Sequence, residues 1–247
     1  MPRKNRSTQG PFIREIILQR DQVESFRAYP FSIPVVRSLG TLPLHPSVTF
    51  FVGENGSGKS TLLEAIAVAW RLNAEGGDRR MSHGTWASHS SLSEYLTLVR
   101  PPTWAGRSFF LRAESYYNHA TAIEHTGFLT EFGGESLHEM SHGESFNAFF
   151  MRAMKGAGLY ILDEPEAALS PQRQLALLKR LDELVKEGSQ FIIATHSPII
   201  MAYPNAMIYG CTLRGIAPIE YRDTDHYRTT KAFLDDRHAF LRHLLAR

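Results

Sequence analysis

The chain has 247 residues, 43% hydrophobic and 21% charged, with a formal net charge of +2 at pH 7. This predicts one globular domain over residues 1–247 and gives no indication of a nucleic-acid or anionic-membrane partner. The single Cys211 excludes an intrachain disulfide, and no signal peptide or apolar run of roughly 20 residues is present, so we expect a cytoplasmic protein without a transmembrane segment.

The first half of the chain predicts a strand, a loop and a helix in succession. Residues Phe12 to Gln19 and Ser47 to Gly53 are rich in Ile, Val, Phe and Thr, which favours two strands. Apolar residues recur at helical spacing from Lys59 to Leu72, which predicts a helix directly after the second strand. Four prolines interrupt regular structure between the two strands: Pro30, Pro34, Pro43 and Pro46.

The middle of the chain is less regular. Residues 73–107 are rich in Ser, Gly, His and Trp, with a helix predicted near Ser93 to Val99 before Pro101. Ser108 to Ala113 predicts a further strand, and the apolar pattern after Glu144 predicts a helix.

The second half contains two short apolar runs separated by an amphipathic helix. The runs "LYILDEP" and "QFIIATHSP" are typical of strands buried on both faces, and the helix starts at Pro171 and ends before Gly188. A strand, helix and strand with short links indicate a parallel crossover. The fold class is therefore α/β, with a mainly parallel central sheet flanked by helices and ligands at the carboxyl ends of the strands.

A phosphate-binding loop lies between the second strand and the following helix. "GENGSGKS" satisfies the pattern G-x-x-x-x-G-K-[ST], in which backbone N–H groups and a helix N-terminus surround phosphates. Lys59 would reach the β and γ phosphates, and the Ser60 hydroxyl would ligate Mg²⁺. The predicted ATP-binding residues are Gly53, Glu54, Asn55, Gly56, Ser57, Gly58, Lys59, Ser60 and Thr61.

Two carboxylates follow the buried run "LYIL". Asp163 would hold Mg²⁺ through water, and Glu164 would polarise the attacking water during displacement at the γ-phosphoryl group. The alternative is an acidic pair that caps a helix before Pro165. His196, at the end of the next buried run, would hydrogen-bond the γ-phosphate, although a histidine there is also compatible with a purely structural role.

The order of these motifs resembles the ATP-binding cassette (ABC) class of P-loop ATPases. "MSHGE" occupies the place of that class's "LSGGQ" signature, and the alternative is an ordinary turn before a helix. The resemblance implies that Ser141, His142, Gly143 and Glu144 contact ATP bound to a second subunit, so that ATP joins a homodimer. Histidine and glutamate replace a glycine and the glutamine of the signature, and Ser170 replaces a usual aspartate.

The resemblance also implies two further features of the site. Glu114 stands by position where the class has a glutamine, and it could ligate Mg²⁺ directly or through water. The class often stacks an aromatic residue on adenine, for which Phe26, Tyr29 and Phe31 are the candidates.

The domain plan follows from the same resemblance. Residues from about 73 to 158 would form an inserted helical subdomain that carries the signature, and residues 225–247 a C-terminal helical tail. The tail is similar to that of small stand-alone bacterial ATPases related to the RecF and chromosome-maintenance branch. It is interpreted either as a helical hairpin that covers the sheet or as a partner-docking element.

Three functions remain open from the sequence. The first is a free-standing ATPase that binds Mg²⁺ and ATP, dimerises around ATP, releases ADP and phosphate, and drives a protein partner. The second is the nucleotide-binding subunit of a membrane transporter. The third is a RecF-like DNA-binding protein, although nucleic acid is not indicated by the charge and no heptad arms are present.

Overall fold

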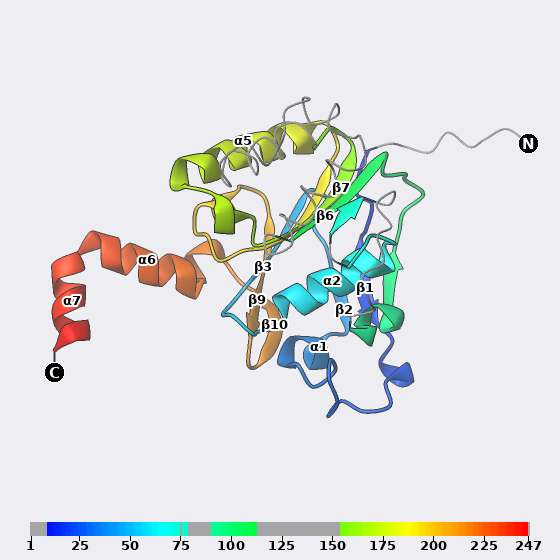
Figure 1. The fold of residues 1–247 in the computed structure, drawn as a ribbon, viewed down its shortest axis with the longest axis horizontal. Coiled ribbons are helices and arrows are strands. Elements are labelled where there is room, and N and C mark those ends of the chain that lie inside the picture. Colours follow the sequence, from blue (N-terminus) through cyan, green and yellow to red (C-terminus); the bar gives the residue numbers. More distant parts are fainter. Residues whose placement is uncertain (1–8, 75, 79–89, 113–153, 247) are drawn as a thin grey trace, which may run out of the picture.

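A computed structural model describes residues 9–74, 76–78, 90–112 and 154–246. Its centre is a seven-stranded sheet with helices on both faces, beside a smaller three-stranded sheet (Figure 1). This architecture is the mainly parallel α/β fold expected from the sequence.

The large sheet has the strand order β10-β9-β3-β8-β7-β6-β4. Its five inner strands are parallel, while β10 and β4 pair antiparallel at the two edges. The strands are β3 (Val48–Val52), β4 (Gly77–Asp78), β6 (Arg107–Arg112), β7 (Gly158–Asp163), β8 (Gln190–Ala194), β9 (Met207–Thr212) and β10 (Gly215–Pro218). The strands predicted from residues 47, 108, 159 and 190 are thus confirmed.

Helices cover the two faces of this sheet. The α-helices are α1 (Pro34–Ser38), α2 (Lys59–Ala69), α5 (Pro171–Lys186), α6 (Asp225–Asp235) and α7 (Arg237–Leu245), and the 3-10 helices are η1 (Arg20–Gln22), η2 (Ser91–Tyr95), η4 (Pro165–Ala168), η5 (Ile200–Ala202) and η6 (Tyr221–Asp223). Helix α2 packs on one face and α5 on the other (Figure 1). As predicted, α5 begins at Pro171; the Ser170 side chain accepts a hydrogen bond from Arg173 N at its start.

The inner strands are buried on both faces because alternate residues enter two different cores. In β8, Ile192 and Ala194 join the core beneath α2, while Phe191 and Ile193 join the core beneath α5. The strands β3 and β7 divide in the same way. This explains why their sequences are continuous apolar runs.

The smaller sheet has the order β2-β1-β5, with β1 (Glu15–Leu18), β2 (Thr41–Pro43) and β5 (Leu96–Val99) all antiparallel. The helix predicted over residues 93–99 is wrong, because Leu96–Val99 pairs with β1 as a strand and only a 3-10 helix precedes it. Elements α1 and β2, in the proline-rich segment, were not predicted.

The Gln190 side chain ties the small sheet to the large one. Its Oε1 accepts hydrogen bonds from Phe12 N (2.8 Å) and Ile13 N (2.9 Å), and its Nε2 donates to Ile13 O (2.7 Å) and His45 O (3.1 Å). Gln190 is completely buried. A polar side chain inside an apolar strand is therefore stable because its whole amide is paired.

Backbone pairing aligns the carboxyl ends of four strands at one level. Arg112 pairs with Asp163, Asp163 with Ala194, and Ala194 with Phe51 across the ladder from β6 to β3. Whatever follows β3, β7 and β8 in the sequence therefore emerges at the same edge of the sheet.

The C-terminal helices α6 and α7 extend away from the body of the molecule (Figure 1). Neither contains a buried residue, and Phe233 of α6 packs edge-on against Phe240 of α7 with ring centroids 5.6 Å apart. The tail consists of two consecutive helices, as expected, but they do not cover the sheet. Within the described ranges, no helix is both long and apolar enough to cross a membrane.

Candidate nucleotide site

The loop between β3 and α2 has the tight form that its glycines predict. Gly53 and Gly58 adopt φ angles of 154° and 97°. A Cβ on Gly53 would lie 2.1 Å from the Cys211 carbonyl oxygen, and one on Gly58 would lie 2.5 Å from Ile33 Cγ2. Both positions therefore require glycine, because the loop passes close to β9 on one side and to the start of α1 on the other.

Lys59 is the first residue of α2 and lies folded against its own loop. Its exposed fraction is 3%, and its Nζ donates to Gly53 O (2.7 Å) and Glu54 O (3.0 Å). Burial lowers the Lys59 pKa, and the carboxylate of Glu164 partly opposes this effect. The ammonium group thus lies inside the loop, where an anion would replace the two carbonyl groups as its partner.

The buried hydroxyl of Ser57 has no hydrogen-bond partner in this loop. An unpaired buried hydroxyl is costly, and an acceptor such as a phosphate oxygen would satisfy it. Together with the N-terminus of α2, these groups fit a phosphate.

Ser60 and Asp163 come together although they are far apart in the sequence. Ser60 Oγ donates to Asp163 Oδ1 at 3.1 Å. Burial raises the pKa of Asp163 to about 6, against the opposing effects of the Ser60 hydrogen bond and of Arg112, whose Nε lies 3.8 Å from Asp163 Oδ2. The pair offers hard oxygen atoms of the type that Mg²⁺ prefers, Ser60 as a direct ligand and Asp163 as a partner for metal-bound water.

The described residues contain no group of three or more His, Cys, Asp or Glu side chains that could hold a metal ion. The donor set at Ser60 and Asp163 nevertheless fits Mg²⁺, which is commonly bound by few protein oxygens together with nucleotide phosphates and water. A magnesium ion here would depend on the phosphates for its remaining ligands.

Glu164 and His196 form the second pair of the site. Glu164 follows β7 with φ 52° and ψ 54°, a left-handed conformation that is uncommon for a residue with a side chain. His196 Nε2 lies 3.1 Å from Glu164 Oε1, and the two side chains are 25% and 37% exposed. The carboxylate is thus held beside the phosphate loop and remains accessible.

His196 has two further partners. Its backbone N–H donates to Glu166 Oε1 at 2.5 Å, and its Nδ1 lies 2.9 Å from Nε2 of His226 in α6. The histidine is therefore contacted through three of its polar atoms, by the segment after β7 and by the start of α6.

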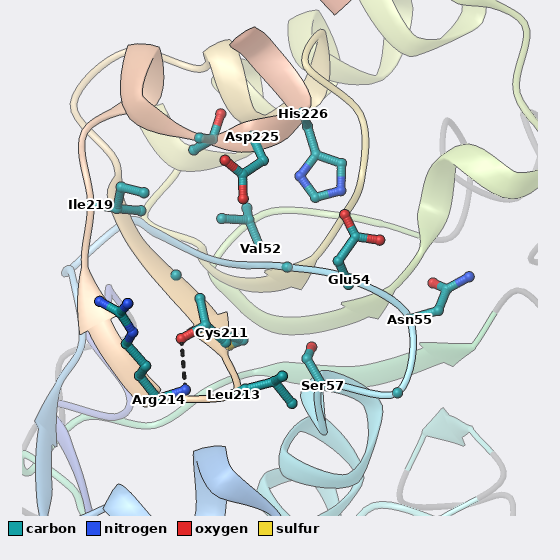
Figure 2. Close-up of a pocket in the computed structure, with 15 residues that line it drawn as sticks. Val52, Glu54, Asn55, Ser57, Cys211, Leu213, Arg214, Ile219, Asp225 and His226 are labelled. Atoms are coloured by element: carbon teal, nitrogen blue, oxygen red, sulfur yellow. Dashed lines mark hydrogen bonds between the residues drawn. The ribbon is translucent and has the colours of Figure 1, made fainter. Parts of the chain in front are cut away.

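A pocket of about 480 Å³ lies on the β9 side of the phosphate loop. Its walls are the loop itself, the β9–β10 turn and the first turn of α6 (Figure 2). Figure 2 shows His226 and Glu54 on one side of the pocket and Leu213 and Arg214 on the other. In the sheet order, β9 and β7 lie on opposite sides of β3, so the pocket is opposite the Asp163 and Glu164 carboxylates.

The structure brings together the predicted phosphate loop, Asp163, Glu164 and His196. The residues Glu114, Ser141, His142, Gly143 and Glu144 lie outside the described residues. The aromatic candidates for adenine are not among the residues that line the pocket: Phe31 is buried against Tyr95 with ring centroids 4.8 Å apart, and Tyr29 is 67% exposed.

Four residues of the site were not predicted. Arg112 NH1 contacts Glu64 Oε2 at 2.9 Å, which places this ion pair beside Asp163. Glu64 lies one helical turn after Ser60, so its spacing could have indicated it. Glu166 lies two residues after Glu164 and could have been considered with it. His226 had no local signal, because only the folded chain brings α6 to His196.

Two family models match parts of the chain. The family described as "AAA domain, putative AbiEii toxin, Type IV TA system" matches residues 134–202, and one described as "AAA domain" matches residues 22–91. The two matches contain the phosphate loop, the acidic pair and His196.

Curated relatives include ATP-binding proteins and a membrane protein of transport systems. The thiamine import ATP-binding protein ThiQ of Cereibacter sphaeroides is 32% identical over 166 residues, which cover 60% of this chain and 69% of that protein. The chelated iron transport system membrane protein YfeB of Yersinia pestis is 28% identical over 61% of this chain, which spans only 57% of its length.

Among solved structures, the SMC head domain from Thermotoga maritima is 15% identical, with a TM-score of 0.46, covering 85% of this chain and all of that one. The 32% sequence identity to ThiQ, over more than two thirds of that protein, shows the family of this chain. This chain belongs to the ATP-binding cassette class of P-loop ATPases.

Proposed function

We propose that the chain binds ATP and Mg²⁺ at the loop of residues 53–60, hydrolyses ATP to ADP and phosphate, and dimerises head to tail around the nucleotide. The observation that carries this proposal is that two pairs of side chains lie at the same edge of the sheet. Ser60 contacts Asp163, and Glu164 contacts His196, each at 3.1 Å. The first pair suits a metal ion, and the second suits water activation and γ-phosphate recognition.

Binding begins with the exchange of partners at Lys59. The Nζ group would leave the carbonyl oxygens of Gly53 and Glu54 and bind phosphate oxygens instead. Because Lys59 is already buried beside the loop, little rearrangement of the helix is required. The backbone N–H groups at the start of α2 would donate to the same phosphates.

A bound Mg²⁺ would neutralise charge on the β and γ phosphates. Ser60 Oγ would ligate it, and Asp163 would accept hydrogen bonds from its water ligands. Burial of Asp163, which raises its pKa to about 6, makes the arrival of a cation favourable at this position.

Glu164 and His196 would then act on the reacting atoms. Glu164 would accept a proton from a water molecule as the water oxygen bonds to the γ phosphorus. The bond from that phosphorus to the bridging oxygen breaks, and the bridging oxygen leaves with ADP. His196 Nε2–H would donate to a γ-phosphate oxygen and would hold the group in line.

The pocket beside the loop would receive the nucleoside. It lies on the β9 side of β3, whereas Asp163 and Glu164 lie at the end of β7 on the other side, which suits a nucleotide whose γ-phosphate points toward Glu164. Its walls include the side chains of Leu213 and Ile219, which suit the face of a base.

The test compares three proteins in ATP binding, phosphate release and sizing chromatography. Lys59→Ala should lose ATP binding by at least tenfold, since a charge-assisted contact is worth about 1.5–3 kcal/mol. Glu164→Gln should bind ATP normally and lose at least a hundredfold in turnover, since it cannot take the proton. With ATP and Mg²⁺, this variant should elute as a dimer.

Lys179→Ala, an exposed lysine on α5, is the matched control and should behave as the unmodified protein. Undiminished ATP binding by Lys59→Ala would overturn the proposal. Undiminished turnover by Glu164→Gln would remove the assigned base. A Glu164→Gln protein that stays monomeric with ATP would remove the dimer and leave hydrolysis standing.

A second candidate is the ATPase subunit of a membrane transporter. It is favoured by the names of the relatives, which include an import ATP-binding protein and a transport system protein. Co-purification of the tagged protein with an integral membrane protein from detergent-solubilised cells would support this function. Full recovery of ATP-dependent dimers from the fraction without membranes would support the free-standing ATPase.

A further inference from the structure

The first turn of α6 contacts the histidine that is proposed to sense the γ-phosphate. Thr224 begins this helix, and its hydroxyl accepts from Tyr227 N at 3.3 Å and donates to Tyr221 O at 2.8 Å. Only 1% of Thr224 is exposed. The start of α6 is therefore fixed to the body of the protein, although the rest of the helix extends into solvent.

His226, two residues after this cap, faces His196. Its Nε2 lies 2.9 Å from His196 Nδ1, with ring centroids 5.0 Å apart and an angle of 64° between the rings. At that separation one nitrogen must carry a hydrogen and the other must accept it.

The other nitrogen of His196 determines which one donates. Its Nε2 lies 3.1 Å from a carboxylate oxygen of Glu164, and a carboxylate only accepts hydrogen bonds. His196 Nε2 must then carry a hydrogen, so neutral His196 has a lone pair on Nδ1. His226 Nε2–H donates to that lone pair.

Burial lowers the pKa of His226, which favours its neutral form. A neutral His226 with its hydrogen on Nε2 matches the geometry.

We propose that His226 is a positioning residue that holds the His196 ring with its Nε2–H toward the γ-phosphate, and so links the C-terminal helices to the nucleotide site. The inference rests on the proposed ATP hydrolysis. Any shift of His196 from Glu164 toward a γ-phosphate would change its contact with His226 in the first turn of α6. Beyond this turn, α6 and α7 contain no buried residues.

The experiment uses His226→Leu, which removes the donor, and His226→Gln, whose amide nitrogen replaces Nε2–H. His238→Leu, at an exposed tail histidine on α7, is the matched control. In His226→Leu, kcat should fall by about tenfold to a hundredfold, as when outer partners of a functional histidine are removed. His226→Gln should recover most of the lost kcat.

A double-mutant cycle separates positioning from general destabilisation. Adding His226→Leu to His196→Ala should cause no further loss of kcat, because the residue that it positions is already absent. An additive loss would overturn the proposal, as would His226→Leu with normal kcat.

The tautomer of His196 is also measured directly in the unmodified protein. Long-range ¹H–¹⁵N correlation spectra distinguish the two histidine tautomers, and the His196 signals are assigned from their loss in His196→Ala. His196 should be the Nε2–H tautomer and should become a mixture in His226→Leu. The Nδ1–H tautomer in the unmodified protein would overturn the proposal. If Lys59→Ala keeps full ATP binding, the proposed function fails; if only the His226 results fail, the function stands without this link.

Discussion

Single residues of the site combine burial with charge. Lys59 is buried with its ammonium group bonded to two carbonyls, and Asp163 is buried with a raised pKa. Glu164 is held in a left-handed backbone conformation, which costs roughly 1–2 kcal/mol for a residue with a Cβ. Such strain occurs at sites where the surrounding structure fixes a functional side chain.

The thiol of Cys211 provides a test at this scale. Burial raises its pKa from 9.0 to about 12. The reactive thiolate is therefore scarce at pH 8, and iodoacetamide should label the urea-unfolded protein but hardly the folded one. Mass spectrometry after timed labelling measures this, and equal labelling rates in both states would contradict the burial of the thiol.

The same shift predicts a loss of stability at alkaline pH. Because the folded thiol holds its proton more tightly than the unfolded thiol, this contribution is complete below pH 9 and is lost as pH rises toward 12. Tyr160, with its pKa raised by burial from 10.0 to about 12, acts in the same direction. Urea unfolding at pH 8, 9.5 and 11 should show a shallower decline in Cys211→Ala than in the unmodified protein; equal declines would exclude this role.

At the scale of elements, the inner strands depend on polar groups as well as on apolar ones. Gln190 is the first residue of β8, and it bonds to the backbone at Phe12, Ile13 and His45. The segment before β1 is thereby connected to the central sheet over a large distance in sequence.

Replacement of Gln190 by Leu should destabilise the protein by roughly 2–4 kcal/mol, because buried backbone N–H and C=O groups would lose their partner. Urea denaturation measures the change, and Gln22→Leu, at an exposed glutamine, is the control. A loss below about 0.5 kcal/mol, similar to that of the control, would show that the backbone groups find other partners.

The elements best predicted from the sequence were those whose local pattern agrees with their final packing. β3, β7 and β8 are apolar on both faces, and α5 has Pro171 at its start and Gly188 after its end. β5 was missed because its identity depends on pairing with β1, which lies far away in the sequence. Residues Asp163, Glu164 and His196 were found because each lies at or just after the end of a strand, whereas His226 required knowledge of where α6 lies.

At the scale of the whole molecule, the described residues form a sheet core with the nucleotide site at one edge, and the helices α6 and α7 extend from this edge. The pair begins at the wall of the pocket and ends in solvent (Figure 1). Large apolar side chains remain exposed on it, including Leu234, Leu244 and Leu245. The one described contact between the site and this pair that the mechanism uses is made by His226.

Two truncations distinguish the effect of α6 on kcat from that of α7. Removal of residues 237–247 takes away α7 but keeps His226, so kcat should remain within about twofold of the full chain. Removal of residues 225–247 should lower kcat as His226→Leu does, with a change in melting temperature of only a few degrees, since no residue of α6 or α7 is buried. Phosphate-release kinetics and thermal melts measure both, and equal kcat losses in the two truncations would assign the effect to α7 instead.

The register of the strands decides which sequence changes the site tolerates. Arg112, Asp163 and Ala194 are neighbours in one row because hydrogen bonds between main chains fix their register. Side-chain swaps that keep the core volume should leave the spacing of the carboxylates intact. A one-residue deletion within Leu159 to Leu162 would instead turn Asp163 toward the opposite face, and Ser60 would lose its partner however well the core repacked.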